Sequence, residues 1–128
     1  MNKKSQSSME FFALVGLAFL ATILFAAIAV NEVREFSDQK EFLMIKDLSL
    51  RLQKEVAIAA SVENGYERSF ALEDKIEGKL DYFIIVTNMS INVNSSKASF
   101  SARIPLIYGK NFTKGSNKIE KINGKVYV

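Results

Sequence analysis

The sequence lacks several residue types on which catalysis and cross-linking depend: it has no cysteine, no histidine, no tryptophan and a single proline. Without cysteine there is no disulfide framework. Without histidine and cysteine, the commonest general base, a common nucleophile and the usual transition-metal ligands are missing. A glycine-rich phosphate loop is also missing, because Gly109-Lys110 and Lys114-Gly115-Ser116 do not have the Walker spacing. We therefore expect no enzyme activity, no metal, no other cofactor and no small-molecule substrate.

The net charge of +3 is too small to indicate nucleic-acid binding, so we expect no nucleic-acid partner. The charge is unevenly distributed, since residues 31–96 are rich in acids and residues 97–128 are rich in lysine. Two interpretations stay open. The opposite charges let the tail of one copy face the acidic middle of another, or they form solvated surfaces.

Residues 11–30 form a long apolar run without any charged side chain. As a helix this run is about 30 Å long, which is the thickness of the hydrocarbon core of a bilayer. It is longer than the apolar region of a secretory signal peptide, which has about 7–15 residues. Lys3 and Lys4 precede the run and acids follow it, so the positive-inside rule predicts a cytoplasmic N-terminus and an external location for everything after Val30.

The start of the apolar run carries a spaced pattern of four residues: Gln6, Ser8, Glu10 and Leu14. Lys3, Lys4 and the small Ser5 precede it. The pattern resembles the class III signal peptide of archaeal type IV pilins, in which a prepilin peptidase cuts just before the Gln and leaves the apolar helix on the mature protein. The resemblance implies cleavage between Ser5 and Gln6 and a leader of residues 1–5. Such peptides usually have Gly or Ala before the cut, and Ser5 stands in that place here.

Glu10 places a carboxylate directly beside the apolar run. An acid near hydrocarbon is costly unless it stays hydrated at the headgroup level or meets a cation. Both readings are open from the residues alone. The pilin resemblance implies the second one, because Glu10 would be the fifth residue of the mature chain and would meet the N-terminal amine of a neighbouring subunit. Glu10 would then set the register of assembly, and the apolar surface that begins with Phe11 and Phe12 would hold the subunits together.

The helix is expected to continue beyond Val30, because residues 31–60 contain neither proline nor glycine. Apolar residues recur mostly three or four apart and predict one apolar face: Val33, Phe36, Phe42, Ile45, Leu48, Leu52, Val56 and Ala59. Asn64-Gly65 is a suitable end, since glycine readily adopts the left-handed conformation that terminates helices. We therefore expect a membrane-spanning segment over residues 6–30 and an amphipathic continuation over residues 31–64.

Residues 65–128 have the alternating pattern of β-strands. The candidate strands are Glu67 to Leu72, Leu80 to Asn88, Ser90 to Asn94, Ala98 to Pro105, Lys118 to Ile122 and Lys125 to Val128. Asn123-Gly124 is the strongest hairpin signal. The expected fold is α+β: a long N-terminal helix whose second half packs against one small antiparallel sheet, as in type IV pilins.

Three sequons of the form N-x-S/T start at Asn88, Asn94 and Asn111, and each can accept an N-glycan if the protein is external. Asn111, which is expected in a loop, is the best candidate. Asn88, which is expected beside a strand, is the weakest. Asn and Ser are also the residues of ordinary turns, so turn chemistry is the competing explanation.

The pilin resemblance implies a structural subunit of an archaeal surface filament used for attachment. Its partners would be the membrane before assembly, the prepilin peptidase, an assembly platform with its cytoplasmic ATPase, and further copies in a homo-oligomeric filament. It would be a membrane precursor and then an extracellular glycoprotein filament.

Other interpretations stay open. One is a monomeric membrane-anchored surface protein or a minor pilin, and another is an archaellin-like subunit. A third is a secreted binding domain released by ordinary signal peptidase, for which Ala27-Ile28-Ala29 offers a cleavage pattern.

Overall fold

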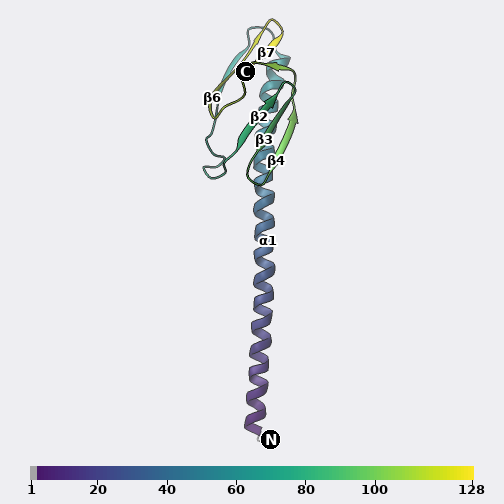
Figure 1. Ribbon diagram of the computed structural model, residues 1–128, viewed down its shortest axis with the longest axis vertical. Coiled ribbons are helices and arrows are strands. Elements are labelled where there is room, and N and C mark those ends of the chain that lie inside the picture. Colours follow the sequence, from purple (N-terminus) through teal and green to yellow (C-terminus); the bar gives the residue numbers. More distant parts are fainter. Residues whose placement is uncertain (1–2) are drawn as a thin grey trace. The chain divides into compact units, whose positions relative to one another are not determined.

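A computed structural model describes residues 3–128, with side chains from Gln6 onward. Two compact units divide the chain, Met1–Ser37 and Asp38–Val128. The described residues form one helix and seven strands: α1 (Lys3–Ser61), β1 (Glu67–Leu72), β2 (Phe83–Thr87), β3 (Ser90–Asn94), β4 (Ser99–Arg103), β5 (Ile107–Tyr108), β6 (Gly115–Ile122) and β7 (Lys125–Tyr127). The predicted α+β class is confirmed: a long, apolar N-terminal helix packs in its second half against small, mainly antiparallel sheets (Figure 1).

The C-terminal end of α1 is capped by a strand. The last turn of the helix contains no basic side chain. Instead, Lys121 of β6 donates from Nζ to the carbonyl oxygens of Ala60 and Val62, both at 2.7 Å. The last carbonyls of a helix have no intrahelical donor, so this ammonium group satisfies them. Gly65 follows with φ of 92°, as expected for a glycine just beyond a helix end.

The strands form two sheets, not the single sheet expected from the sequence. Their orders are β1-β6-β7-β5 and β2-β3-β4. All pairs are antiparallel except β5 with β7. The bounds of β1 and β3 agree with the prediction, whereas β5 was not predicted. It contains only two residues and pairs with a strand far along the chain, so no local alternation marks it.

The predicted hairpin at Asn123-Gly124 is confirmed. It joins β6 to β7 with φ of 51° at Asn123 and 78° at Gly124. Positive φ at both central residues is the requirement of a type I′ turn, which Asn-Gly meets best. The amide of Gly124 donates to Oδ1 of Asn64 at 2.7 Å, which ties the hairpin to the segment after α1.

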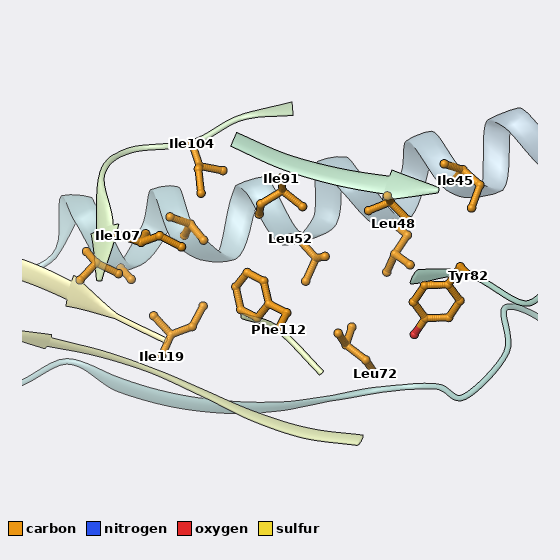
Figure 2. Close-up of a cluster of buried hydrophobic side chains, with 14 residues drawn as sticks. Ile45, Leu48, Leu52, Leu72, Tyr82, Ile91, Ile104, Ile107, Phe112 and Ile119 are labelled. Carbon is orange, nitrogen blue, oxygen red and sulfur yellow. The ribbon is translucent and has the colours of Figure 1, made fainter. Parts of the chain in front are cut away.

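The hydrophobic core of the unit Asp38–Val128 lies between α1 and the inner faces of the sheets. Figure 2 shows Leu52 of α1, Ile91 of β3 and Phe112 pointing toward one another. The helix contributes a stripe with the spacing predicted from the sequence: Ile45, Leu48, Leu52, Val56 and Ala59. All five are buried, because this face of α1 lies against the strands.

The predicted apolar face extends too far toward the N-terminus. Val33 is 68% exposed and Phe36 is 70% exposed, so neither belongs to the core. Ile45 lies nine positions after Phe36, which is about two and a half turns of a regular helix, so the two cannot share one face. Phe42 marks the edge of the core, with its ring edge-on to that of Phe100 at a centroid distance of 6.1 Å.

Candidate functional site

The predicted processing residues lie in the first turns of α1. Gln6, Ser8, Glu10 and Leu14 are all exposed. Residues four apart share a helix face, so Gln6, Glu10 and Leu14 lie in line and Ser8 lies off that line. The side chains of Lys3, Lys4 and Ser5 lie outside the described residues. The backbone of the predicted cut, between Ser5 and Gln6, belongs to the first turn of α1.

Glu10 is the one acid in an otherwise apolar stretch. Its neighbours Met9 and Phe11 are each 65% exposed. Within the described side chains, Glu10 takes part in no salt bridge. A carboxylate that is moved from water into an apolar bundle needs a cation beside it, because an unpaired buried charge costs about 3–5 kcal/mol. A cover over this part of the helix must therefore either bring a positive group to Glu10 or leave its carboxylate hydrated.

The aromatic residues predicted to hold subunits together are next to Glu10 and open to the outside. The rings of Phe11 and Phe12 meet edge to face, with centroids 6.2 Å apart and planes at 70°. Phe12 is 71% exposed. Gly16 leaves an open notch, because no atom lies within 4 Å of where a Cβ would stand. Small residues of this kind allow a second helix to approach closely.

The apolar run is exposed within the described part of the chain. Its large apolar side chains between Phe11 and Val30 are 49–74% exposed. The most apolar stretch of α1 has a mean hydropathy of 2.7, and none of it is buried. A helix at the centre of a globular domain would be buried, whereas a helix that is apolar all round needs lipid or other helices around it. Its length and composition are compatible with crossing a membrane and anchoring the protein there.

The three sequons differ in exposure. Asn88 is exposed and occupies the turn between β2 and β3, and Asn111 is exposed in the segment before β6. Asn94 is half-buried at the end of β3, between Phe83 and Ser99 of the neighbouring strands. From the sequence, Asn88 was the weakest of the three glycosylation candidates because it was expected beside a strand. The exposures favour Asn88 and Asn111 over Asn94.

The compact unit Asp38–Val128, which we call the head, contains a cavity of about 310 Å³ beside α1, at the level of Asp47 and Arg51. Glu73 and Tyr82 also line it. The hydroxyl of Tyr82 donates to the backbone carbonyl of Glu73. Burial raises the pKa of Tyr82 above its usual value of 10.0, and the carboxylates of Glu73 and Asp74 add to this effect. The phenol is therefore a neutral structural donor at physiological pH. Among the described residues, no group of three His, Cys, Asp or Glu side chains is placed to hold a metal ion.

A basic and aromatic face lies on the outside of the first sheet, and sequence patterns did not single it out. Tyr108 of β5 and Tyr127 of β7 are paired in register, with ring centroids 5.8 Å apart. The ammonium group of Lys125 lies 5.1 Å from the centroid of the Tyr108 ring. Lys110 is exposed two residues after Tyr108. We call these four residues the basic face. The lysine-rich tail was the only sequence signal for it.

Apolar side chains of the head are also exposed without a sequence-based expectation. Leu43 is 60% and Leu50 is 41% exposed on α1, and Phe83 and Ile85 of β2 are 56% and 48% exposed. Leu43 and Leu50 are seven residues apart, or about two turns, so they share one face of the helix. Ile45 and Leu52, each two residues further on, lie on the far side and form the core.

The long apolar N-terminal helix, packed in its second half against small antiparallel sheets, resembles the arrangement of type IV pilins. Comparison with protein-family models, with curated proteins and with solved structures finds no match. The resemblance therefore rests on this arrangement and on the spaced residues Gln6, Ser8, Glu10 and Leu14.

Proposed function

We propose that this protein is the structural subunit of an archaeal surface filament of the type IV pilus kind, used for attachment to surfaces. The observation that carries the proposal is the apolar helix from Phe11 to Val30, which is exposed within the described residues and directly follows Gln6, Ser8 and Glu10 of the processing pattern. An uncovered apolar helix needs lipid or other helices around it. The membrane covers it in the precursor, and helices of further copies cover it in the filament.

Processing explains why the pattern stands where it does. A prepilin peptidase cuts before Gln6 and removes the leader of residues 1–5 with Lys3 and Lys4. The first four amides of a helix have no intrahelical acceptor, so unwinding this turn for cleavage breaks few hydrogen bonds. The cut leaves one ammonium group on Gln6, and Glu10 of a neighbouring subunit supplies one carboxylate. A membrane platform driven by a cytoplasmic ATPase then moves the helix from the bilayer into the filament.

Helix packing supplies the cohesion. If each subunit buries about 1,000 Å² of apolar surface against its neighbours, the gain is about 25 kcal/mol before the entropic cost of association. A gain of this size is enough for a stable polymer. Glu10 contributes register instead of stability, since a mismatched position would leave its charge buried without a partner.

The head faces the medium in this proposal. Asn88 and Asn111 are exposed and have the sequon form, so glycans attached there would cover its surface. The compact unit Asp38–Val128 has its own core, which also fits a second candidate, a secreted domain cut after Ala29.

The test is the mass and N-terminal sequence of the mature protein from its native cells, together with electron microscopy of the cell surface. We expect a start at Gln6 and filaments that contain the chain. A start at Val30 would identify a secreted domain, and an intact Met1 would identify a plain membrane anchor. Either result overturns the proposal.

Two variants sharpen this measurement. Ser5→Gly restores the residue usual before the cut and is expected to be processed as well as the wild type. Ser5→Leu places a bulky side chain there and is expected to keep Met1 and to yield no filaments. Normal processing of Ser5→Leu would show that another enzyme cuts the chain.

A further inference from the structure

The acid beside the basic face defined above, Tyr108, Lys110, Lys125 and Tyr127, is Glu120, which stands opposite Tyr127 on β6 and pairs with Lys118 at 3.1 Å. Neither Lys110 nor Lys125 takes part in a salt bridge within the described side chains. Tyr108 remains 38% exposed although the ammonium group of Lys125 lies over its ring. Tyrosine is enriched in protein interfaces, and ammonium groups without a salt bridge favour a partner of negative charge.

The same unit contains a surface of opposite character. The cavity of about 310 Å³ beside α1 has an apolar floor that includes Leu48 and Leu72, and acids at its rim. We call it the acidic cavity. Asp47 and Glu73 of its lining form no salt bridge within the described side chains, whereas Glu77 lies 3.5 Å from Lys40. Arg51 is the one basic residue of the lining, and the ammonium group of Lys114 lies 4.8 Å from the ring centroid of Tyr82.

The two surfaces lie at opposite ends of the head. The acidic cavity is beside Asp47 and Arg51 of α1. The basic face belongs to β5 and β7, and β7 follows directly on β6, whose Lys121 contacts the end of α1 at Ala60. Ala60 lies thirteen positions after Asp47 in the helix, which is about 20 Å along the axis. Figure 1 likewise draws β7 beside the C-terminal end of α1.

We propose that the basic face of one copy of this chain docks on the acidic cavity of the next copy. Complementary charges at opposite ends of one head favour a head-to-tail contact. Such a contact is heterologous, and it produces an open filament when the rotation between copies does not close into a ring. The aliphatic stems of Lys110 and Lys125 cover the apolar floor while their ammonium groups meet Asp47 and Glu73. This inference rests on the proposed filament function and names the contact between its heads.

If this contact forms, charge-reversal variants should change the stability of filaments assembled from the full chain in a specific pattern. K110E/K125E and D47K/E73K each place like charges at every head-to-tail contact. We expect each double variant to lower the urea concentration at which half of the subunits dissociate, measured at low salt, by about twofold. The quadruple variant K110E/K125E/D47K/E73K restores opposite charges with reversed sign, and we expect it to recover the wild-type midpoint.

A matched control separates the contact from net charge. K54E/R103E makes the same change of net charge as K110E/K125E at exposed positions outside both surfaces, and we expect it to leave the midpoint unchanged. All variants should still yield a mature chain that starts at Gln6, which verifies processing, and should show a cooperative urea transition of the unit Asp38–Val128, which verifies folding.

Two results overturn the contact while leaving the filament function intact: double variants with the wild-type midpoint, and a quadruple variant that is no better than the doubles. A wild type that is processed at Gln6 but forms no filament would instead overturn the proposed function.

Discussion

The Nζ atom of Lys121 lies 2.7 Å from the carbonyl oxygen of Ala60, and the same ammonium group reaches the carbonyl of Val62 at 2.7 Å. The negative end of the α1 dipole and two unpaired carbonyls thus meet a cation that comes from a strand. This contact links the end of the helix to β6, 59 to 61 positions away in the sequence.

Lys121→Met should therefore weaken the head. The substitution keeps the length of the side chain but removes the charge and both hydrogen bonds, so we expect a loss of about 1–2 kcal/mol in the free energy of unfolding. Urea denaturation of the mature chain in detergent, followed by tyrosine fluorescence, measures it. Lys79→Met, an exposed lysine outside the helix end, is the control and should change stability by less than about 0.5 kcal/mol. Equal losses of unfolding free energy in the two variants would show that Lys121 does not stabilise the end of α1.

Leu52 and Leu50 allow a comparison between the two faces of α1. Leu52 is fully buried, whereas Leu50 is 41% exposed. Leu52→Ala leaves a cavity in the core and should cost about 2–5 kcal/mol of unfolding free energy. Leu50→Ala removes the same atoms from a half-open position and should cost less than about 1 kcal/mol. The same urea titration measures both, and a cost at Leu50 as large as that at Leu52 would contradict the packing described here.

Tyr82 should make the free energy of unfolding depend on pH in the alkaline range. Its pKa is raised above 10.0, chiefly by burial and also by Glu73 and Asp74, so the folded state keeps the phenol proton to a higher pH than the unfolded chain does. The resulting stabilisation is complete below pH 10.0 and disappears as the pH rises through the folded-state pKa. Tyr82→Phe should lower stability by about 1 kcal/mol at neutral pH because the hydrogen bond to Glu73 is lost.

Measuring the unfolding free energy of the wild type and of Tyr82→Phe at several pH values tests whether Tyr82 causes the alkaline loss of stability. Above pH 10.0, unfolding free energy should fall more steeply in the wild type than in Tyr82→Phe. Hydrogen bonds to Glu120 and Glu67 also raise the pKa of Lys118, so Lys118 contributes a further alkaline loss, but it does so in both proteins. Parallel curves for the two proteins would exclude Tyr82 as a source of the pH dependence.

Glu10→Ala should separate processing from assembly. We expect the variant to insert and to be cut before Gln6, since the apolar run is unchanged, but to assemble poorly because the ammonium group of each neighbour loses its carboxylate. The amount of filament relative to mature subunit in the membrane measures this. Glu32→Ala, which removes another exposed acid of α1, should assemble normally. Normal filaments from Glu10→Ala would remove the assembly role from this residue.

Glycan occupancy should follow exposure. Asn88→Gln and Asn111→Gln should each lower the mass of the native protein by one glycan, because both asparagines are exposed in connecting segments. Asn94→Gln should change the mass only by the substitution, because Asn94 is half-buried within a strand pair. Intact-mass spectrometry of protein from native cells distinguishes these outcomes. A glycan on Asn94 would show that exposure does not determine which asparagine is glycosylated.

Local patterns in the sequence determined much of this protein. The three-to-four spacing of Ile45, Leu48 and Leu52 predicted the buried stripe, and Asn123-Gly124 predicted its turn, because side-chain direction and backbone preference act over a few residues. The apolar run and the pattern around Glu10 were likewise visible before any fold was known. Each of these features depends only on neighbours along the chain.

Features that join distant segments of the chain were decided by the tertiary structure. The split into two sheets, the parallel pairing of β5 with β7 and the capping of α1 by Lys121 all join segments that are far apart in the sequence. The basic face and the acidic cavity arise in the same way, since Lys110 and Lys125 are brought together by β5 and β7. Composition fixed how many charges the chain carries, but only strand pairing and helix packing placed the two signs at opposite ends of the head.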